Sequence, residues 1–293
     1  MTAYKYRNVN AFPSGDSLGN PAACLYLEKQ QILSDAQMLA IAKHHNGFVS
    51  EVVFCTESTG TSFDLTYYSS ECEVNFCGHG TIACLHSLIC SSPNLLGCKQ
   101  LKLNTRRKGS LLMHNRIPEN GSVLISAPRP EYLTAKLALT EIADGLEIAK
   151  DNISPDYPID FIDAGNRTLI VPIKGFDSTV SLFPDEQKLK SFSLKNDIDV
   201  ILIFCMDRKD SVHKAHTRVF APKFGYLEDP ATGSANSAFG YYMLKNNMWD
   251  GTGITLEQGG NDRVFNAVHL CVENDSLLFG GNATTRIDGV YYI

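Results

Sequence analysis

Residues 77–81 read Cys-Gly-His-Gly-Thr, and residues 230–234 read Pro-Ala-Thr-Gly-Ser. Each run ends in a glycine and a hydroxyl residue, and each leads into small and apolar residues that predict a helix. Similar turns separated by about half of the 293 residues indicate a duplicated unit. The sequence therefore predicts two similar halves, each with a helix that begins at a glycine-containing turn.

The start of each predicted helix is suited to bind an anion. Backbone N–H groups in the first helical turn lack intrahelical acceptors, so they bind a carboxylate or another oxyanion. Two such helix ends facing one cleft between two domains would form a carboxylate site with little water. Cys77 and His79 would lie beside the first end. A plain glycine-rich strand-to-helix turn is the alternative explanation of the glycines.

A carboxylate also interrupts the apolar segment 48–54, which reads Phe-Val-Ser-Glu-Val-Val-Phe. A strand here would place Glu51 on one face with Val49 and Val53, and both faces would be largely buried. Burial raises the pKa of a carboxyl group, which suits a general acid or base that works near neutral pH. A Glu at a strand edge, or one paired with a distant Arg or Lys, is the structural alternative.

Local signals place further elements along the chain. Ser34 and Gln37 form a capping box that predicts the start of a helix. Helices are also expected over residues 134–146 and 185–195. The continuous apolar run at 199–206 predicts a strand that is buried on both faces.

A crossover at residues 128–130, Pro-Arg-Pro, divides the predicted elements into two domains. We expect an N-terminal domain over residues 1–126 and a C-terminal domain over residues 127–293. In an alternative arrangement, a last strand near residues 280–293 returns to the first domain. Composition does not change at the boundary, so the crossover alone defines it.

The composition is that of an ordinary globular chain, with 44% hydrophobic and 20% charged residues. The formal net charge of -6 argues against nucleic-acid and anionic-membrane partners, and the basic cluster at 106–108 is typical of a solvated turn. No apolar run approaches the roughly eighteen residues of a spanning helix, and the N-terminus does not read as a signal peptide. We therefore expect neither a membrane nor a nucleic-acid partner.

The cysteines and histidines give no pattern of a metal or cofactor site. Nine cysteines without a Cys-x-x-Cys pair predict reduced thiols, and hence a cytoplasmic protein. His213 and His216 are expected on a strand, where they would point to opposite faces, so we expect no metal site. The chain contains no P-loop, dinucleotide fingerprint or nucleophile elbow.

Several motifs occur in order along nearly the whole chain: Asn20-Pro21, Ser50-Glu51, residues 77–81, residues 218–222, residues 228–235 and residues 257–259. Together they resemble the phenazine-biosynthesis PhzF-like family, and the Glu-Asp-Pro-Ala-Thr-Gly-Ser-Ala run at 228–235 is highly specific. The resemblance implies an α/β chain with the diaminopimelate-epimerase fold. In that fold two similar domains each form a strand barrel around a central helix, with the active site between them.

The resemblance also implies an activity. It implies a cofactor-independent isomerase in which Glu51 moves a proton on a small carboxylated substrate by general acid–base catalysis. His79 and Asp229 would hold or polarise that substrate. The resemblance also implies a homodimer, which is the commonest assembly among soluble oligomers. Backbone donors of the two helix ends would stabilise the developing negative charge. The implied substrate-binding residues are Asn20, Gly78, Gly80, Thr232, Gly233 and Ser234.

One position departs from the related epimerases, which carry two cysteines on opposite sides of the substrate carbon. This chain has Cys77 at the first position and Pro230 at the second, which argues against a symmetric two-thiol racemase. Cys77, whose pKa a helix N-terminus can lower, is either inert or an additional acid–base group in a dehydratase or an epimerase. A non-catalytic member that binds a metabolite or a protein in the cleft is a further alternative. The sequence does not identify the substrate.

Overall fold

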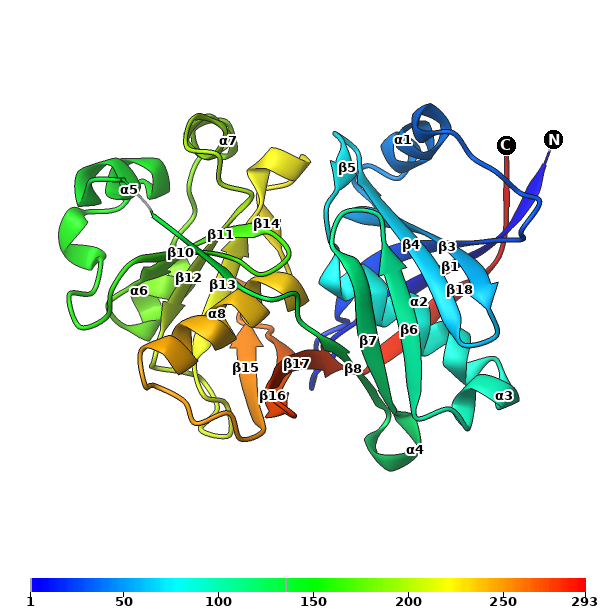
Figure 1. Ribbon diagram of the computed structural model, residues 1–293. Helices are drawn as coiled ribbons and strands as arrows, with labels where there is room; N and C mark the ends of the chain where they lie inside the picture. Colours follow the sequence, from blue (N-terminus) through cyan, green and yellow to red (C-terminus); the bar gives the residue numbers. More distant parts are fainter. Residues whose placement is uncertain (1, 135) are drawn as a thin grey trace.

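The computed structural model describes residues 2–134 and 136–293, which form two lobes of strands and helices (Figure 1). The first half of the chain contains β1 (Ala3–Ala11), β2 (Asn20–Leu27), α1 (Asp35–His44), β3 (Glu51–Thr59), β4 (Ser62–Ser69), β5 (Glu73–Val74), α2 (Gly78–Cys90), α3 (Pro93–Leu96), β6 (Gln100–Thr105), β7 (Gly109–Arg116), α4 (Ile117–Asn120) and β8 (Ser122–Ser126). The second half contains β9 (Glu131–Leu133), α5 (Leu139–Leu146), η1 (Lys150–Asn152), β10 (Asp160–Asp163), β11 (Arg167–Pro172), α6 (Phe176–Ser181), α7 (Glu186–Lys195), β12 (Val200–Cys205), β13 (His216–Phe220), η2 (Pro222–Phe224), β14 (Glu228–Asp229), α8 (Gly233–Lys245), β15 (Ile254–Gln258), β16 (Asn266–Glu273), β17 (Ser276–Gly281) and β18 (Ala283–Tyr292).

The two halves repeat the same strand pairings. In the first half, β2 runs parallel to β3, β3 antiparallel to β4, and β4 parallel to β6. In the second half, β11 runs parallel to β12, β12 antiparallel to β13, and β13 parallel to β15. The helices α2 and α8 follow the equivalent short strands β5 and β14. The duplication predicted from the two glycine turns is therefore present in the strand order.

The end of the chain returns to the first lobe. β18 pairs with β1 from Ala283 to Tyr292, and β17 pairs with β8. Figure 1 accordingly shows the two chain termini close together at the edge of that lobe. The domain limits 1–126 and 127–293 stay a prediction.

Each lobe is built around one buried helix. Ten residues of α2 and ten of α8 are buried, and α2 packs against β1, β2, β3, β8 and β18. A helix buried on most sides belongs to the core of a lobe rather than to its surface. α8 packs in the same way against β10, β11, β12, β16 and β17. Strands therefore surround each central helix on several sides.

Local capping explains where several elements begin. The predicted capping box is present, because Ser34 accepts the Gln37 N–H and the Gln37 side chain accepts the Ser34 N–H. The predicted helix at 185–195 is α7, which Asp185 caps, and the predicted buried strand is β12, whose residues are all buried. These predictions are confirmed.

Two boundaries were predicted wrongly. The strand expected from Phe48 begins only at Glu51, and Phe48 is 53% exposed, because residues 45–50 still complete the turn after α1. Val49 consequently packs with Val52, not on the face of Glu51. The helix expected over 134–146 begins at Leu139, where Glu141 accepts the N–H of the preceding residue. Residue 135 of that expected helix lies outside the described residues.

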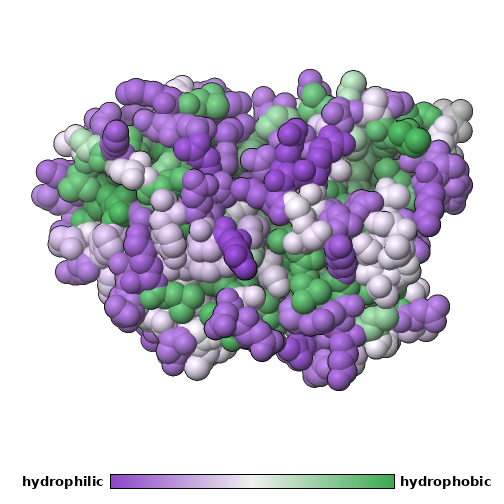
Figure 2. All heavy atoms as spheres, viewed as in Figure 1, coloured by the Kyte–Doolittle hydropathy of each residue, from purple (hydrophilic) through white to green (hydrophobic). Residues whose placement is uncertain are grey.

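The exterior is mainly hydrophilic on the face that Figure 2 shows, with smaller hydrophobic areas on both lobes. Among residues 2–134 and 136–293, none of the helices combines the length and the apolar character needed to cross a membrane. The large apolar side chains instead gather inside the lobes, where the main core cluster includes residues of both α2 and α8.

The N-termini of α2 and α8 are in direct contact. A Cβ atom on Gly78 would lie 2.8 Å from the Ser234 nitrogen and 3.0 Å from the Gly233 Cα atom. A Cβ atom on Gly233 would overlap the ring of Phe279. Glycine is therefore required at both helix starts by close approach, not by an unusual backbone angle.

Replacing Gly78 by alanine tests this contact. We expect Gly78→Ala to lower the free energy of unfolding by about 1–3 kcal/mol, because the added methyl group meets backbone that belongs to the other lobe. Urea denaturation measures the change. Gly60→Ala is the matched control, since its Cβ atom would have no neighbour within 4 Å. Equal stability of Gly78→Ala and the wild type would show that the helix ends are not in contact.

Candidate active site

Four predicted catalytic side chains lie together where the two helix ends meet. Glu51 begins β3, His79 lies in the first turn of α2, and Asp229 ends β14, and each is at most 3% exposed. The Nε2 atom of His79 is 3.3 Å from Glu51 Oε2, and its Nδ1 atom is 4.0 Å from Asp229 Oδ2. Cys77 Sγ is 3.6 Å from His79 Nδ1. The imidazole of His79 therefore lies between two carboxyl groups that come from different lobes.

Burial sets the protonation of these groups. Burial, followed by the charge of Asp229, raises the pKa of Glu51 to about 8. Burial also raises the pKa of Asp229 to about 7, and it lowers the pKa of His79 to about 3. The 3.3 Å approach of His79 to Glu51 is thus a contact of a neutral ring, not an ion pair. The cluster holds two carboxyl groups that gain and lose protons near neutral pH.

Cys77 is the N-cap residue of α2, and its Sγ atom accepts the Gly80 N–H at 3.2 Å. A helix N-terminus alone would lower the pKa of this thiol. Burial, together with the charge of Glu51, instead raises the pKa of Cys77 well above its ordinary value. Near neutral pH the side chain is therefore a thiol, which can donate a proton but is a poor nucleophile.

Asp229 is oriented by hydrogen bonds from both lobes. Asn20 donates to Asp229 Oδ1 at 2.6 Å and to the carbonyl oxygen of Ala231 at 2.7 Å. Thr232 donates to Asp229 Oδ2 at 2.5 Å, and the Gln258 amide donates to the Asp229 carbonyl at 2.7 Å. Asn20, predicted to bind substrate, thus contributes directly to the position of a predicted catalytic residue.

The predicted substrate-binding residues at the two helix ends differ in the availability of their backbone N–H groups. Gly78, Gly233 and Ser234 lie in first helical turns, where N–H groups have no intrahelical acceptor. The Gly80 N–H is already donated to Cys77, and the Thr232 N–H to Gln258. The first three residues can therefore donate to a carboxylate, whereas the backbone of Gly80 and Thr232 serves the protein itself.

Sequence reasoning missed two residues of this site. Asn166, in the turn before β11, donates to Ser234 Oγ at 3.0 Å and to the Phe76 carbonyl at 3.1 Å. Tyr226, in the loop before β14, donates to Glu51 Oε1 at 2.6 Å. Asn166 could have been recognised from the sequence as a polar residue in a glycine-containing turn before a buried strand. No feature of the sequence identified Tyr226, because its partner Glu51 lies 175 positions away in the chain.

The sequence matches the family described as phenazine biosynthesis-like protein, PhzC-PhzF, over residues 9–289. The chain belongs to this family. Uncharacterized isomerase YfhB of Bacillus subtilis (strain 168) is 27% identical over 252 residues, which cover 85% of this chain and 84% of that one.

Solved structures share the fold of this PhzC-PhzF chain. A phenazine biosynthesis protein of the PhzF family from Bacillus anthracis aligns over 100% of both chains with a TM-score of 0.83 and 22% identity. A hydroxyproline epimerase from Agrobacterium vitis covers 99% of this chain and 91% of its own, with a TM-score of 0.67 and 11% identity. The predicted family and its two-domain, epimerase-like α/β fold are therefore confirmed.

Within residues 2–134 and 136–293 of the PhzC-PhzF chain, one group of side chains has the composition and spacing of a metal site. Donor atoms of Glu51, Cys77 and His79 lie within 4.8 Å of one another. A metal ion binds the thiolate of cysteine, and burial raises the pKa of the Cys77 thiol well above its ordinary value. A metal ion at this position would therefore have to displace the Cys77 proton against the burial that retains it.

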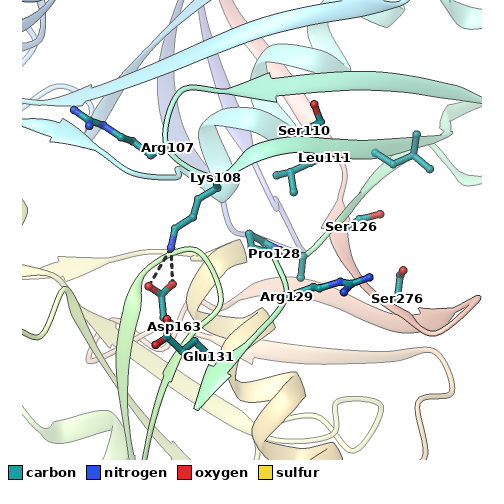
Figure 3. A pocket seen from close by; sticks show the side chains of 12 residues that line it. Arg107, Lys108, Ser110, Leu111, Ser126, Pro128, Arg129, Glu131, Asp163 and Ser276 are labelled. Atoms are coloured by element: carbon teal, nitrogen blue, oxygen red, sulfur yellow. Dashed lines mark hydrogen bonds and ion pairs between the residues drawn. The ribbon is translucent and has the colours of Figure 1, made fainter. Parts of the chain in front are cut away.

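A separate groove of about 660 Å³ lies between the lobes of the PhzC-PhzF chain and contains none of the cluster residues (Figure 3). Lys108 crosses it and donates to Asp163 Oδ1 at 2.8 Å. Arg107, the neighbouring residue, pairs with Glu73. The basic turn that was predicted to be solvated therefore takes part in an ion pair between the lobes.

The raised pKa of Glu51 gives a test by pH-dependent stability. The folded protein keeps a proton that the unfolded chain releases above pH 4.5, so Glu51 lowers stability progressively as the pH rises towards about 8. The side chain in Glu51→Gln remains neutral at every pH. The free energy of unfolding of this variant should therefore exceed that of the wild type by roughly 2 kcal/mol or more at pH 9, with a smaller difference at pH 5. Denaturant titration at both pH values measures this.

Glu57→Gln is the matched control for that titration, because Glu57 lies exposed on the same strand. It should leave the pH dependence of stability unchanged. A Glu51→Gln protein that is less stable than the wild type at pH 9 would contradict the raised pKa.

Proposed function

We propose that this protein is a cofactor-independent isomerase that moves a proton on a small carboxylated metabolite, with Glu51 as the acid–base group. The observation that carries the proposal is a fully buried carboxyl group, whose pKa burial raises to about 8, beside two abutting helix N-termini. The name uncharacterized isomerase of the relative from Bacillus subtilis supports the reaction class.

The helix ends suit a carboxylate of the substrate. Gly78, Gly233 and Ser234 lie in the first turns of two helices whose N-termini are in contact, so the N–H groups and dipoles at this point favour negative charge. A substrate carboxylate held at this point would lie beside the Glu51 cluster. The same donors would then stabilise the charge that develops when an adjacent carbon loses its proton.

The proposed reaction needs only proton transfers. Ionised Glu51 removes a proton from a substrate carbon, and the electron pair of the broken C–H bond delocalises into the adjacent unsaturated or carboxyl group. The protonated Glu51 then returns the proton to a different carbon, which gives an isomer without net oxidation. Neutral His79, between Glu51 and Asp229, can donate a hydrogen bond to a substrate oxygen.

A dehydratase or an epimerase that uses Cys77 is the second candidate. The thiol lies 3.6 Å from His79 and stays protonated, so it can deliver a proton to a substrate carbon. In an epimerase, Glu51 would remove a proton from one face of the carbon and Cys77 would supply one to the other. Pro230, at the equivalent second helix end, excludes the symmetric arrangement of two thiols.

Deuterium incorporation tests the proposal. The purified protein is incubated in D₂O with pools of small carboxylated metabolites, and mass spectrometry detects any acid that gains mass. Glu51→Gln should lower the exchange rate roughly 10²–10⁴-fold, whereas Glu57→Gln, exposed on the same strand, should exchange like the wild type. Exchange should also persist after dialysis against EDTA.

The same assay separates the two candidates. If Cys77→Ala keeps both exchange and net conversion, the one-base isomerase is supported. If it keeps exchange but loses net conversion, Cys77 is the second acid. Exchange that survives in Glu51→Gln, or its absence from every pool with the wild type, contradicts the proposed function.

A further inference from the structure

Tyr226 reaches the Glu51 cluster from the other lobe. Its segment joins η2 to β14, and Gly225 before it has a φ angle of +92°. A Cβ atom on Gly225 would lie 2.9 Å from Ser70 Oγ and 3.0 Å from Glu71 Cγ, so this segment packs directly on the turn between β4 and β5. The glycine thereby allows the loop to approach the first lobe closely enough for Tyr226 to contact Glu51.

The tyrosine contact makes the two oxygens of Glu51 different. Oε1 accepts the Tyr226 hydroxyl at 2.6 Å. Oε2 is buried and has no hydrogen-bond partner among the described residues, although His79 Nε2 lies 3.3 Å away. A buried carboxyl oxygen without a partner is costly, and a bound ligand that shares a proton with it would remove that cost.

We propose that Tyr226 is a positioning residue that holds Glu51 through Oε1 and leaves Oε2 as the atom that exchanges the proton with the substrate. This inference rests on the proposed function, because it specifies how the same carboxyl group acts. Tyr226 acts only through Glu51 and contributes from the second lobe to the acid–base group of the first. The base is therefore complete only when the two lobes are in contact.

The chemistry of Tyr226 fits a permanent donor. Burial, followed by the charge of Glu51, raises the pKa of Tyr226 well above its ordinary value, so the hydroxyl keeps its proton. Donation to Glu51 opposes the burial that raises the pKa of the carboxyl group. The other titratable groups that face Glu51 are His79 and Cys77 from the start of α2 and Asp229 from β14. Of these groups, His79 approaches Oε2, whereas Tyr226 donates to Oε1.

The first test needs no substrate. Infrared difference spectra between the wild type and Glu51→Gln are recorded from pH 4 to 10. They isolate the C=O stretch of protonated Glu51. In Tyr226→Phe, this band should move to higher wavenumber, because the C=O group loses its donor. Its titration midpoint should rise by about one to two pH units, because the ionised form loses a charge-assisted hydrogen bond.

Tyr241→Phe is the matched control, since Tyr241 lies on α8 in the same lobe and the titratable groups that act on it are Tyr132 and Arg129, not Glu51. It should leave both the band and its midpoint at the wild-type values. Tyr226→Leu, which also removes the ring, is a second variant and should shift the midpoint in the same direction as Tyr226→Phe.

The second test uses an acid that exchanges deuterium with the wild type. In Tyr226→Phe, kcat at neutral pH should fall about tenfold with its pH profile moved to higher pH, while KM changes less than about twofold. An unchanged band, midpoint and pH profile would overturn the role of Tyr226. Exchange that survives in Glu51→Gln would instead refute the proposed function, whatever Tyr226→Phe shows.

Discussion

The close approach of the α2 and α8 N-termini is the constraint on which the rest of the structure depends. A Cβ atom on Gly78 would overlap the backbone of Gly233 and Ser234, so the two central helices of the duplicated halves begin in direct contact inside the protein. Their free N–H groups and dipoles then concentrate positive potential at one point. The site is not formed by surface loops, because the contact between the two central helices of the duplicated fold creates it.

Carboxyl groups at this point make the protein less stable than it would otherwise be. Glu51 and Asp229 are both buried, and burial raises the pKa of each towards neutral pH. The hydrogen bonds from Asn20, Thr232 and Tyr226 offset part of that cost and fix each group in place. A buried acid that titrates near neutral pH is unfavourable for folding but suited to general acid–base catalysis.

The sequence predicted those features that local signals encode. The paired glycine turns predicted the duplication, and the isolated carboxylate in an apolar segment singled out Glu51. The start of β3 was misplaced because the turn after α1 continues through residue 50, which hydrophobicity alone does not reveal. The partners Tyr226 and Asn166 come from distant segments, so only the tertiary structure brings them to Glu51 and Ser234.

The most direct measurement is the pKa of the Glu51 carboxyl group by ¹³C NMR of protein labelled at glutamate side-chain carbonyl carbons. The resonance that disappears in Glu51→Gln identifies the group, and its chemical shift is followed with pH. The structure predicts a midpoint of about 8. A midpoint near 4.5, the ordinary value of a glutamate side chain, would show that Glu51 is a solvated carboxylate and would contradict a buried acid–base group between the helix ends.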